Sequence, residues 1–207
     1  MFKSLIRRIK KWQNKSFWQR RWSDPKYQPH WLAEGAREQV KQAFESGWIS
    51  DGDTVLDIGC GVGNNAIWLA QQGCRVVGFD IAAAAIERAK SAAGQTQGVT
   101  FSVGDVSETL DYGQKFDVLI DLGCLHQLPR PVWRHYKRNM EGWTKPGTKL
   151  LLVMKTFDEH SQKVVAEARK ALEPFFDVVS TEEVSMSADS KSKHKPGVCM
   201  RLVRKGA

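Results

Sequence analysis

The stretch from Asp53 to Asn65, DTVLDIGCGVGNN, constrains the fold of this chain more than any other. Its first half, TVLDI, is a short and almost continuously apolar run, which is typical of a strand buried on both faces of a parallel sheet. Gly59, Gly61 and Gly63 follow at alternate positions. They let the backbone turn sharply and leave room for a ligand against the main chain before a helix begins. The stretch therefore predicts a nucleotide-type binding site at the carboxyl end of a buried strand.

The spacing of these glycines narrows the class of ligand. A dinucleotide-binding loop requires the pattern G-x-G-x-x-G, and Asn64 occupies the position of its third glycine. A P-loop requires Gly-Lys-Ser/Thr, and no lysine follows the glycines here. The strand instead carries an acid, Asp57, just before the loop. A carboxylate facing the loop suits a cationic amine better than a phosphate.

The order of strand, acid, glycine loop and helix resembles motif I of the class I S-adenosylmethionine-dependent methyltransferases. The cofactor of that family carries an ammonium group and no phosphate, in agreement with the acid. The resemblance extends from Trp18 to the end of the chain. It implies S-adenosylmethionine as the cofactor, S-adenosylhomocysteine as its product, and an enzyme that transfers methyl groups.

Strand and helix patterns alternate over residues 50–173, which predicts a doubly wound sheet with its ligand outside the carboxyl ends of the strands. Besides the first strand, we expect strands at residues 74–79, 99–103, 116–120 and 149–155. Helices are expected at residues 32–46, 64–72, 81–93, from Pro131 through Met140, and at 160–172. Residues 175–179 and 198–203 can pair as the antiparallel hairpin that ends the sheet of the family, and the polar residues 185–195 between them are expected to be a mobile loop. The predicted fold class is α/β: a Rossmann-like seven-stranded sheet, mostly parallel with the last strand antiparallel, with helices on both faces.

Acids map to the carboxyl ends of four predicted strands: Asp57, Asp80, Asp105 and Asp121. Carboxylates that converge on one edge of a sheet repel one another unless a cationic ligand with several hydroxyl groups lies among them. Asp80 lies about 20 residues past the glycine loop, where a carboxylate would accept ribose hydroxyls, and it could also cap the helix that follows. The resemblance implies that Asp105 contacts the adenine amine and Val106 packs on the ring, although Asp105 could equally be a turn residue.

The segment Asp121–His126, DLGCLH, falls where the family places motif IV, beside the transferred methyl group. It lacks the N-P-P-Y/F sequence that clamps a planar amino group, which argues against methylation of adenine N6, cytosine N4 or glutamine. His126 is the candidate general base for a neutral hydroxyl or amine, or else a histidine that shapes the loop by hydrogen bonding. Cys124 is expected to be a packing residue, since methyl transfer needs no covalent intermediate.

Aromatic residues are dense over residues 17–31, in a stretch too polar to form a core strand. Trp18, Gln19 and Trp22 form a W-Q-x-x-W pattern before a Pro-His-Trp turn at residues 29–31. This order resembles the segment that folds over the cofactor in thiopurine S-methyltransferase-like enzymes, and such a lid would shield the methyl donor from water. The alternative is that the tryptophans only anchor an N-terminal extension to the domain surface.

The predicted site is the sum of these motifs. The residues assigned to cofactor binding are Asp57, Gly59, Cys60, Gly61, Asn64, Asp80, Ile81, Asp105, Val106, Asp121, Leu122, Trp18 and Trp22. The residues assigned to the substrate pocket are His30, Trp31, Cys124 and His126. No metal site is predicted, because the four cysteines are scattered without a C-x-x-C spacing, and the same scatter argues against a disulfide framework.

The net charge of +8 comes from one end of the chain. Residues 1–22 contain eight Lys or Arg and no acid, so the rest of the chain is neutral. Apolar side chains on one face of residues 2–12 predict a basic amphipathic helix that could cap the domain, lie on an anionic membrane or bind nucleic acid. Nucleic acid is not expected, because the neutral body offers no continuing basic track. We divide the chain into residues 1–31, a basic helix and aromatic lid, and residues 32–207, a methyltransferase domain.

Together the motifs predict a methyltransferase that moves a methyl group from S-adenosylmethionine to the S or O atom of a small molecule by in-line displacement. Within class I the chain is most similar to the branch of thiopurine and tellurite-resistance methyltransferases. No apolar run is long enough to cross a bilayer, so we expect a cytoplasmic protein, with peripheral membrane contact through residues 2–12 left open. The alternatives are a methyltransferase of membrane-associated or lipid substrates, anchored by that helix, and a non-catalytic S-adenosylmethionine-binding domain.

Overall fold

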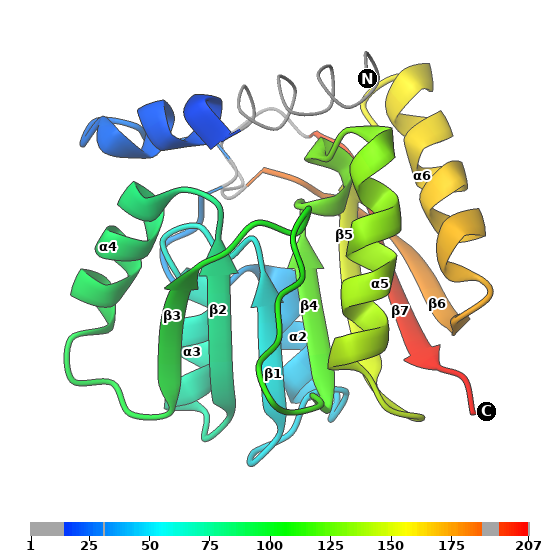
Figure 1. The fold of residues 1–207 in the computed structure, drawn as a ribbon, viewed down its shortest axis with the longest axis horizontal. Coiled ribbons are helices and arrows are strands. Elements are labelled where there is room, and N and C mark those ends of the chain that lie inside the picture. Colours follow the sequence, from blue (N-terminus) through cyan, green and yellow to red (C-terminus); the bar gives the residue numbers. More distant parts are fainter. Residues whose placement is uncertain (1–14, 31, 188–194, 207) are drawn as a thin grey trace.

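A computed structural model describes residues 15–30, 32–187 and 195–206 of the chain. Within them, seven strands form one sheet in the order β3-β2-β1-β4-β5-β7-β6 (Figure 1). Their bounds are Thr54–Ile58 (β1), Arg75–Asp80 (β2), Val99–Val103 (β3), Val118–Leu122 (β4), Lys149–Lys155 (β5), Phe176–Ser185 (β6) and Pro196–Arg204 (β7). Strands β1 to β5 pair in parallel, and β7 runs antiparallel to both β5 and β6. The predicted fold class is confirmed.

Helices cover both faces of this sheet (Figure 1). Their bounds are Glu38–Glu45 (α2), Asn64–Gln71 (α3), Ala83–Ala93 (α4), Trp133–Trp143 (α5) and Glu159–Leu172 (α6), with short 3-10 turns at Leu125–Gln127 (η1) and Arg130–Val132 (η2). Residues 15–23 form a further helix at the edge of the sheet where the parallel strands end. In the part of the chain that the structure describes, no helix has the length and apolar character that a membrane crossing requires.

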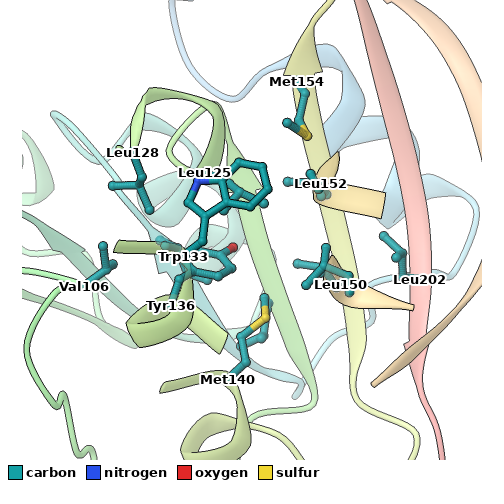
Figure 2. Close-up of a cluster of buried hydrophobic side chains, with 14 of the residues drawn as sticks. Val106, Leu125, Leu128, Trp133, Tyr136, Met140, Leu150, Leu152, Met154 and Leu202 are labelled. Carbon is teal, nitrogen blue, oxygen red and sulfur yellow. The ribbon is translucent and has the colours of Figure 1, made fainter. Parts of the chain in front are cut away.

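The alternation of side chains along β5 explains why the sheet has a core on each face. Leu150, Leu152 and Met154 belong to the core on the side of α5 and α6, as Figure 2 shows, whereas Leu151 and Val153 pack with α2 and α3. All five side chains are fully buried. A strand with two buried faces reads as a continuous apolar run, which is why LLLVM was recognisable as a central strand.

Most predicted boundaries lie within three residues of those in the structure, but two differ by six residues, and each of these differences has a local cause. The helix expected over residues 32–46 begins only at Glu38. Residues before it are bound to α3 instead: Asn64 donates from its side-chain amide to the Ala33 carbonyl at 2.6 Å, and the Arg37 N–H donates to Asn65 Oδ1 at 2.9 Å. The final hairpin is longer than expected, because backbone pairing continues through polar residues as far as Ser185 opposite Pro196.

Three predictions fall wholly or partly on residues that are not described. The basic helix over residues 2–12 and the substrate-pocket assignment of Trp31 lie outside the described residues, as does the centre of the predicted loop at residues 185–195. The division at residue 31 stays a prediction.

Candidate functional site

The glycine loop after β1 has the backbone conformation that its sequence predicts. Gly59 and Gly63 have φ angles of 71° and 81°, which favour glycine. A Cβ at Gly63 would lie 2.6 Å from the Phe101 ring, and a Cβ at Gly59 would lie 2.9 Å from that of Cys124. The Cys60 N–H donates to the Phe79 carbonyl at 2.9 Å, which ties the loop to the end of β2. These contacts hold the loop open toward one side, where a cavity lies.

This cavity is found at the carboxyl ends of the parallel strands, as the topology requires. Most of the residues that the sequence assigned to the cofactor line it: Trp18, Trp22, Asp57, Gly59, Cys60, Gly61, Asn64, Asp80, Ile81, Asp105, Val106 and Leu122. Cys124 and His126, assigned to the substrate, also line it. Of the assigned residues that the structure describes, Asp121 and His30 do not line it.

Asp57 is the polar group of the cavity that most needs a ligand. Its side chain is 2% exposed, and its Oδ2 atom has no hydrogen-bond partner among the described residues. Burial, and then the negative charges of Asp121 and Asp80, raise the pKa of Asp57 to about 8. An ionised carboxylate in this position is costly until a cation or a donor reaches it. The residues present therefore fit a ligand with an ammonium group.

Asp80 and Asp105 both line the cavity and both also hold their own loops. Asp80 accepts the Gly61 N–H at 3.0 Å and the Ala82 N–H at 2.9 Å, so its carboxylate joins the glycine loop to the start of α4. Burial raises the pKa of Asp80, and these two hydrogen bonds partly oppose the shift. Asp105 accepts the Ser107 N–H at 2.8 Å in a turn. For each acid, the structural role and the predicted ligand role are compatible, because a carboxylate oxygen can accept more than one hydrogen bond.

Asp121 requires a correction, since the sequence placed it among the acids that face the ligand. Its carboxylate is fully buried and points into the protein. It accepts the N–H groups of Gly123 at 3.1 Å and Cys124 at 2.7 Å, and the Tyr136 hydroxyl donates to it at 2.8 Å. Asp121 therefore shapes the loop after β4, and its carboxylate is engaged there rather than presented to the cavity.

His126 lies in η1, directly after that loop, and faces the cavity. Its Nδ1 atom is buried without a hydrogen-bond partner in the described part of the chain. Burial, and then the positive charge of Lys155, lower the pKa of His126 to about 4, so the imidazole is neutral at neutral pH. Burial raises the pKa of the neighbouring Cys124 thiol well above its usual range. A neutral imidazole can accept a proton, whereas a protonated thiol is a poor nucleophile.

The helix at residues 15–23 covers one end of the cavity. Trp22 is 3% exposed, and its ring lies 3.4 Å from where a Cβ at Gly61 would stand. The Arg88 guanidinium lies 5.3 Å from the centre of the Trp22 ring, and the Ala84 N–H donates to Gln19 Oε1 at 3.2 Å. Figure 1 shows the helix lying over α4 (blue over green). The aromatic segment thus contacts the glycine loop, as a lid would.

The outer part of the cavity wall contains residues that the sequence did not single out. Arg37, which is 8% exposed, lines the cavity together with Met186. Arg37 Nη2 lies 3.4 Å from the Met186 carbonyl, although the two residues are 149 positions apart. His30 is exposed beside them, with Lys195 Nζ 3.2 Å from its Nε2 atom. Gly35 inside the expected helix was a signal that the chain turns before Arg37, but no signal marked Met186.

No group of three or more metal-binding side chains occurs among residues 15–30, 32–187 and 195–206. The cavity acids are spread over three strand ends, and two of them, Asp80 and Asp105, accept backbone N–H groups.

Comparison with known sequences identifies related proteins. Residues 55–147 match the family described as "Methyltransferase domain". The 2-heptyl-1-hydroxyquinolin-4(1H)-one methyltransferase of Mycobacteroides abscessus is 31% identical over 128 residues, which make up 61% of this chain and 56% of the relative. The chain spans about half the length of the curated relatives it matches.

Solved structures share the fold. The N-methyltransferase NodS from Bradyrhizobium japonicum WM9, in complex with S-adenosylhomocysteine, has a TM-score of 0.75 at 17% identity, covering 94% of this chain and 100% of that one. A 1,6-didemethyltoxoflavin-N1-methyltransferase from Burkholderia thailandensis, with 1,6-didemethyltoxoflavin and S-adenosylhomocysteine bound, has a TM-score of 0.65 at 20% identity and covers 82% of this chain and 80% of that one. The chain therefore has the fold of these methyltransferases.

Proposed function

We propose that this chain, whose residues 55–147 match the family described as "Methyltransferase domain", transfers a methyl group from S-adenosylmethionine to an S or O atom of a small molecule. The observation that carries the proposal is the buried Oδ2 atom of Asp57, which lacks a partner among the described residues and faces the cavity. Asp57 would hold the ammonium group of the donor. Asp80 would accept ribose hydroxyls, and Asp105 with Val106 would contact the adenine.

The remaining residues of the cavity supply positioning and a dry environment. S-adenosylmethionine supplies an electrophilic methyl group whose leaving group departs neutral, so catalysis depends on alignment and exclusion of water. Trp18 and Trp22 would keep water from the donor. His126, neutral at neutral pH, would accept the proton of a hydroxyl acceptor. A thiolate acceptor would need no base, and His126 would then only shape the wall.

A small-molecule acceptor is supported by the names of the relatives. The Mycobacteroides abscessus relative is named for a heterocycle with a hydroxyl group, and the Burkholderia thailandensis structure holds a small heterocycle. The W-Q-x-x-W segment, which contacts the glycine loop, supports a place near the thiopurine and tellurite-resistance branch. We place the protein in the cytoplasm, with the eight basic residues of the first 22 as the candidate contact with anionic lipid.

The test is calorimetry with the donor and its product, followed by an assay of S-adenosylhomocysteine release against thiols, phenols and halides. We expect binding of both nucleosides and turnover of at least one acceptor. Asp80→Ala should weaken nucleoside binding by about tenfold, as expected for the loss of charge-assisted hydrogen bonds. His126→Ala should slow methylation of a phenol far more than it weakens binding. Uptake of NAD or ATP with no heat from S-adenosylmethionine would contradict the proposal, and binding without turnover of any acceptor would favour a non-catalytic domain.

A membrane-associated acceptor is tested separately. Pelleting with anionic liposomes should be compared between the full chain and a chain that starts at Lys15. Loss of pelleting in the shorter chain, together with faster turnover on liposomes, would favour a lipid substrate over a soluble one.

A further inference from the structure

Tyr136 is a buried tyrosine of α5 that the proposed function does not use. Its side chain is 1% exposed and belongs to the core on the side of α5 and α6, as Figure 2 shows. Within this core its hydroxyl donates to Asp121 Oδ2 at 2.8 Å. A buried hydroxyl that donates to a buried carboxylate makes one of the stronger hydrogen bonds in a protein. Tyr136 therefore fixes one oxygen atom of the Asp121 carboxylate.

The carboxylate of Asp121 in turn holds the loop that follows β4. Three successive N–H groups donate to it: those of Gly123 and Cys124 to Oδ1 at 3.1 and 2.7 Å, and that of Leu125 to Oδ2 at 3.1 Å. The Tyr136 hydroxyl and the Leu125 N–H thus share one oxygen atom. The hydroxyl is the one donor of these four that does not belong to the loop itself. Without it, only the loop N–H groups would orient the carboxylate that orients them.

The same loop forms part of the cavity wall. His126 follows Leu125 directly, and its ring packs on the loop, because a Cβ at Gly123 would lie 3.4 Å from His126 Cε1. Cys124 stands against the glycine loop, where a Cβ at Gly59 would lie 2.9 Å from its own Cβ. Gly123, Cys124 and His126 all line the cavity. A shift of this loop would therefore move the imidazole relative to a bound ligand.

We propose that Tyr136 is a positioning residue of the methyl-transfer site, which acts through Asp121 to hold His126 in the cavity wall. The inference rests on the proposed function for what His126 does, whereas the hydrogen bonds from Tyr136 to the loop stand without it. The Nδ1 atom of His126 is buried with no hydrogen-bond partner among the described residues, so the backbone of the loop places the ring. A misplacement of about 1 Å can slow a reaction by about a hundredfold, which makes this placement important for turnover.

The first test needs no substrate. It compares the full chain with Tyr136→Phe, which removes the hydroxyl and keeps the ring in the core, by NMR of amide hydrogen exchange and of the histidine rings. We expect the N–H groups of Gly123 and Cys124 to exchange about tenfold faster in the variant, because they lose an oriented acceptor. The ring signals of His126, identified by their absence in His126→Gln, should shift. Those of His160, which is exposed in α6, should not.

Two further variants show whether the hydroxyl acts through Asp121. Tyr112→Phe is the matched control, because Tyr112 packs on the same core while its hydroxyl bonds to Ser102 in β3. It should change neither the exchange of the loop N–H groups nor the His126 signals. In an Asp121→Asn background, Tyr136→Phe should add little to the effect of Asp121→Asn alone, since two residues that act as one unit are not additive.

The last measurement is turnover of a phenol. Tyr136→Phe should lower kcat about tenfold and leave the affinity for S-adenosylhomocysteine nearly unchanged, because the hydroxyl acts on the position of His126 and not on donor binding. An unchanged kcat, or a loss that appears only in KM, would overturn the inference.

The outcomes separate the inference from the function on which it rests. Unchanged loop exchange and unchanged His126 signals in Tyr136→Phe would overturn the inference and leave the proposed function standing. Equally faster exchange in β5 would reduce Tyr136 to a residue of general stability, and additive effects with Asp121→Asn would show that it does not act through Asp121. No binding of S-adenosylhomocysteine would remove the proposed function, while the exchange and ring signals would still decide whether Tyr136 holds the loop.

Discussion

Asp57 is the residue whose charge depends most on what the cavity holds. Burial and two neighbouring acids raise its pKa to about 8, so at pH 7 the side chain is mostly protonated in the ligand-free protein. A bound ammonium group favours the ionised form and expels the proton. We expect about one proton to be released per S-adenosylmethionine bound at pH 7, and affinity to fall by about tenfold for each pH unit below 8. Calorimetry in two buffers of different ionisation enthalpy measures this release.

Asp57→Asn provides the control for that prediction. The amide cannot titrate, so its binding heat should not depend on the buffer, and its affinity should be weaker and nearly independent of pH. A binding heat that is independent of the buffer in the unaltered protein would show that Asp57 is not the group that meets the ammonium.

Gly63 offers a second prediction at the scale of single residues. An alanine there would adopt a left-handed conformation with φ near 81°, and its Cβ would lie 2.6 Å from the Phe101 ring. The conformation costs about 1–2 kcal/mol and the overpacking about 1–3 kcal/mol. Gly63→Ala should therefore lower the unfolding free energy by roughly 2–5 kcal/mol, as measured by urea denaturation. Gly113 has a similar φ of 65°, but no atom lies within 4 Å of a Cβ added there. Gly113→Ala should therefore cost only the conformational part, about 1–2 kcal/mol.

The elements could be predicted from the sequence wherever one local rule decides them. LLLVM in β5 and the glycine loop after β1 each carry their own pattern, and an acid at the end of such a strand faces the ligand edge by topology alone. Asp121 also stands at the end of such a strand, but its carboxylate does not face the ligand edge. Its carboxylate is drawn inward by the Tyr136 hydroxyl and by N–H groups of its own loop, and these partners become neighbours only in the folded chain. Arg37 and Met186 meet for a similar reason, through the register of the final hairpin.

The helix at residues 15–23 carries the prediction for a whole element. The described contacts that fasten it to the domain include the Gln19 hydrogen bond and the Arg88 stack on Trp22. Trp22→Ala should loosen this helix without unfolding the core, so S-adenosylhomocysteine should bind about tenfold more weakly while the unfolding free energy changes by about 1 kcal/mol. Trp143→Ala, at the last residue of α5, whose side chain is buried in the core, should instead cost about 3–5 kcal/mol of stability. Calorimetry measures the affinity for S-adenosylhomocysteine, and urea denaturation measures the unfolding free energy. Unchanged affinity in Trp22→Ala would mean that the helix only anchors the N-terminal extension to the domain.

At the scale of the whole molecule, the buried acids link ligand binding to stability. The folded-state pKa values of Asp57 and Asp121, about 8 and about 6, lie above the unfolded value near 3.9. Each group therefore favours folding in its protonated form, and this contribution is lost as pH rises from about 4 through the folded pKa. Asp117 has the opposite sign: Lys145 and Thr54 outweigh its burial and lower its pKa to about 2, so its contribution is lost only at acid pH. Between pH 5 and 8, the loss of the contributions from protonated Asp57 and Asp121 therefore dominates the pH dependence of stability.

The ligand-free protein should accordingly unfold more easily at pH 8 than at pH 6, by up to roughly 1.4 kcal/mol per pH unit from Asp57. S-adenosylhomocysteine should offset this loss, because its ammonium group pairs with the ionised Asp57. At the same concentration of S-adenosylhomocysteine, the rise in melting temperature should therefore be larger at pH 8 than at pH 6, because the affinity is higher at pH 8. Asp57→Asn should show a flatter pH dependence without ligand and nearly equal ligand shifts at the two pH values. Thermal denaturation with and without ligand measures these shifts. An equal shift at both pH values in the unaltered chain would mean that Asp57 does not hold the ammonium group.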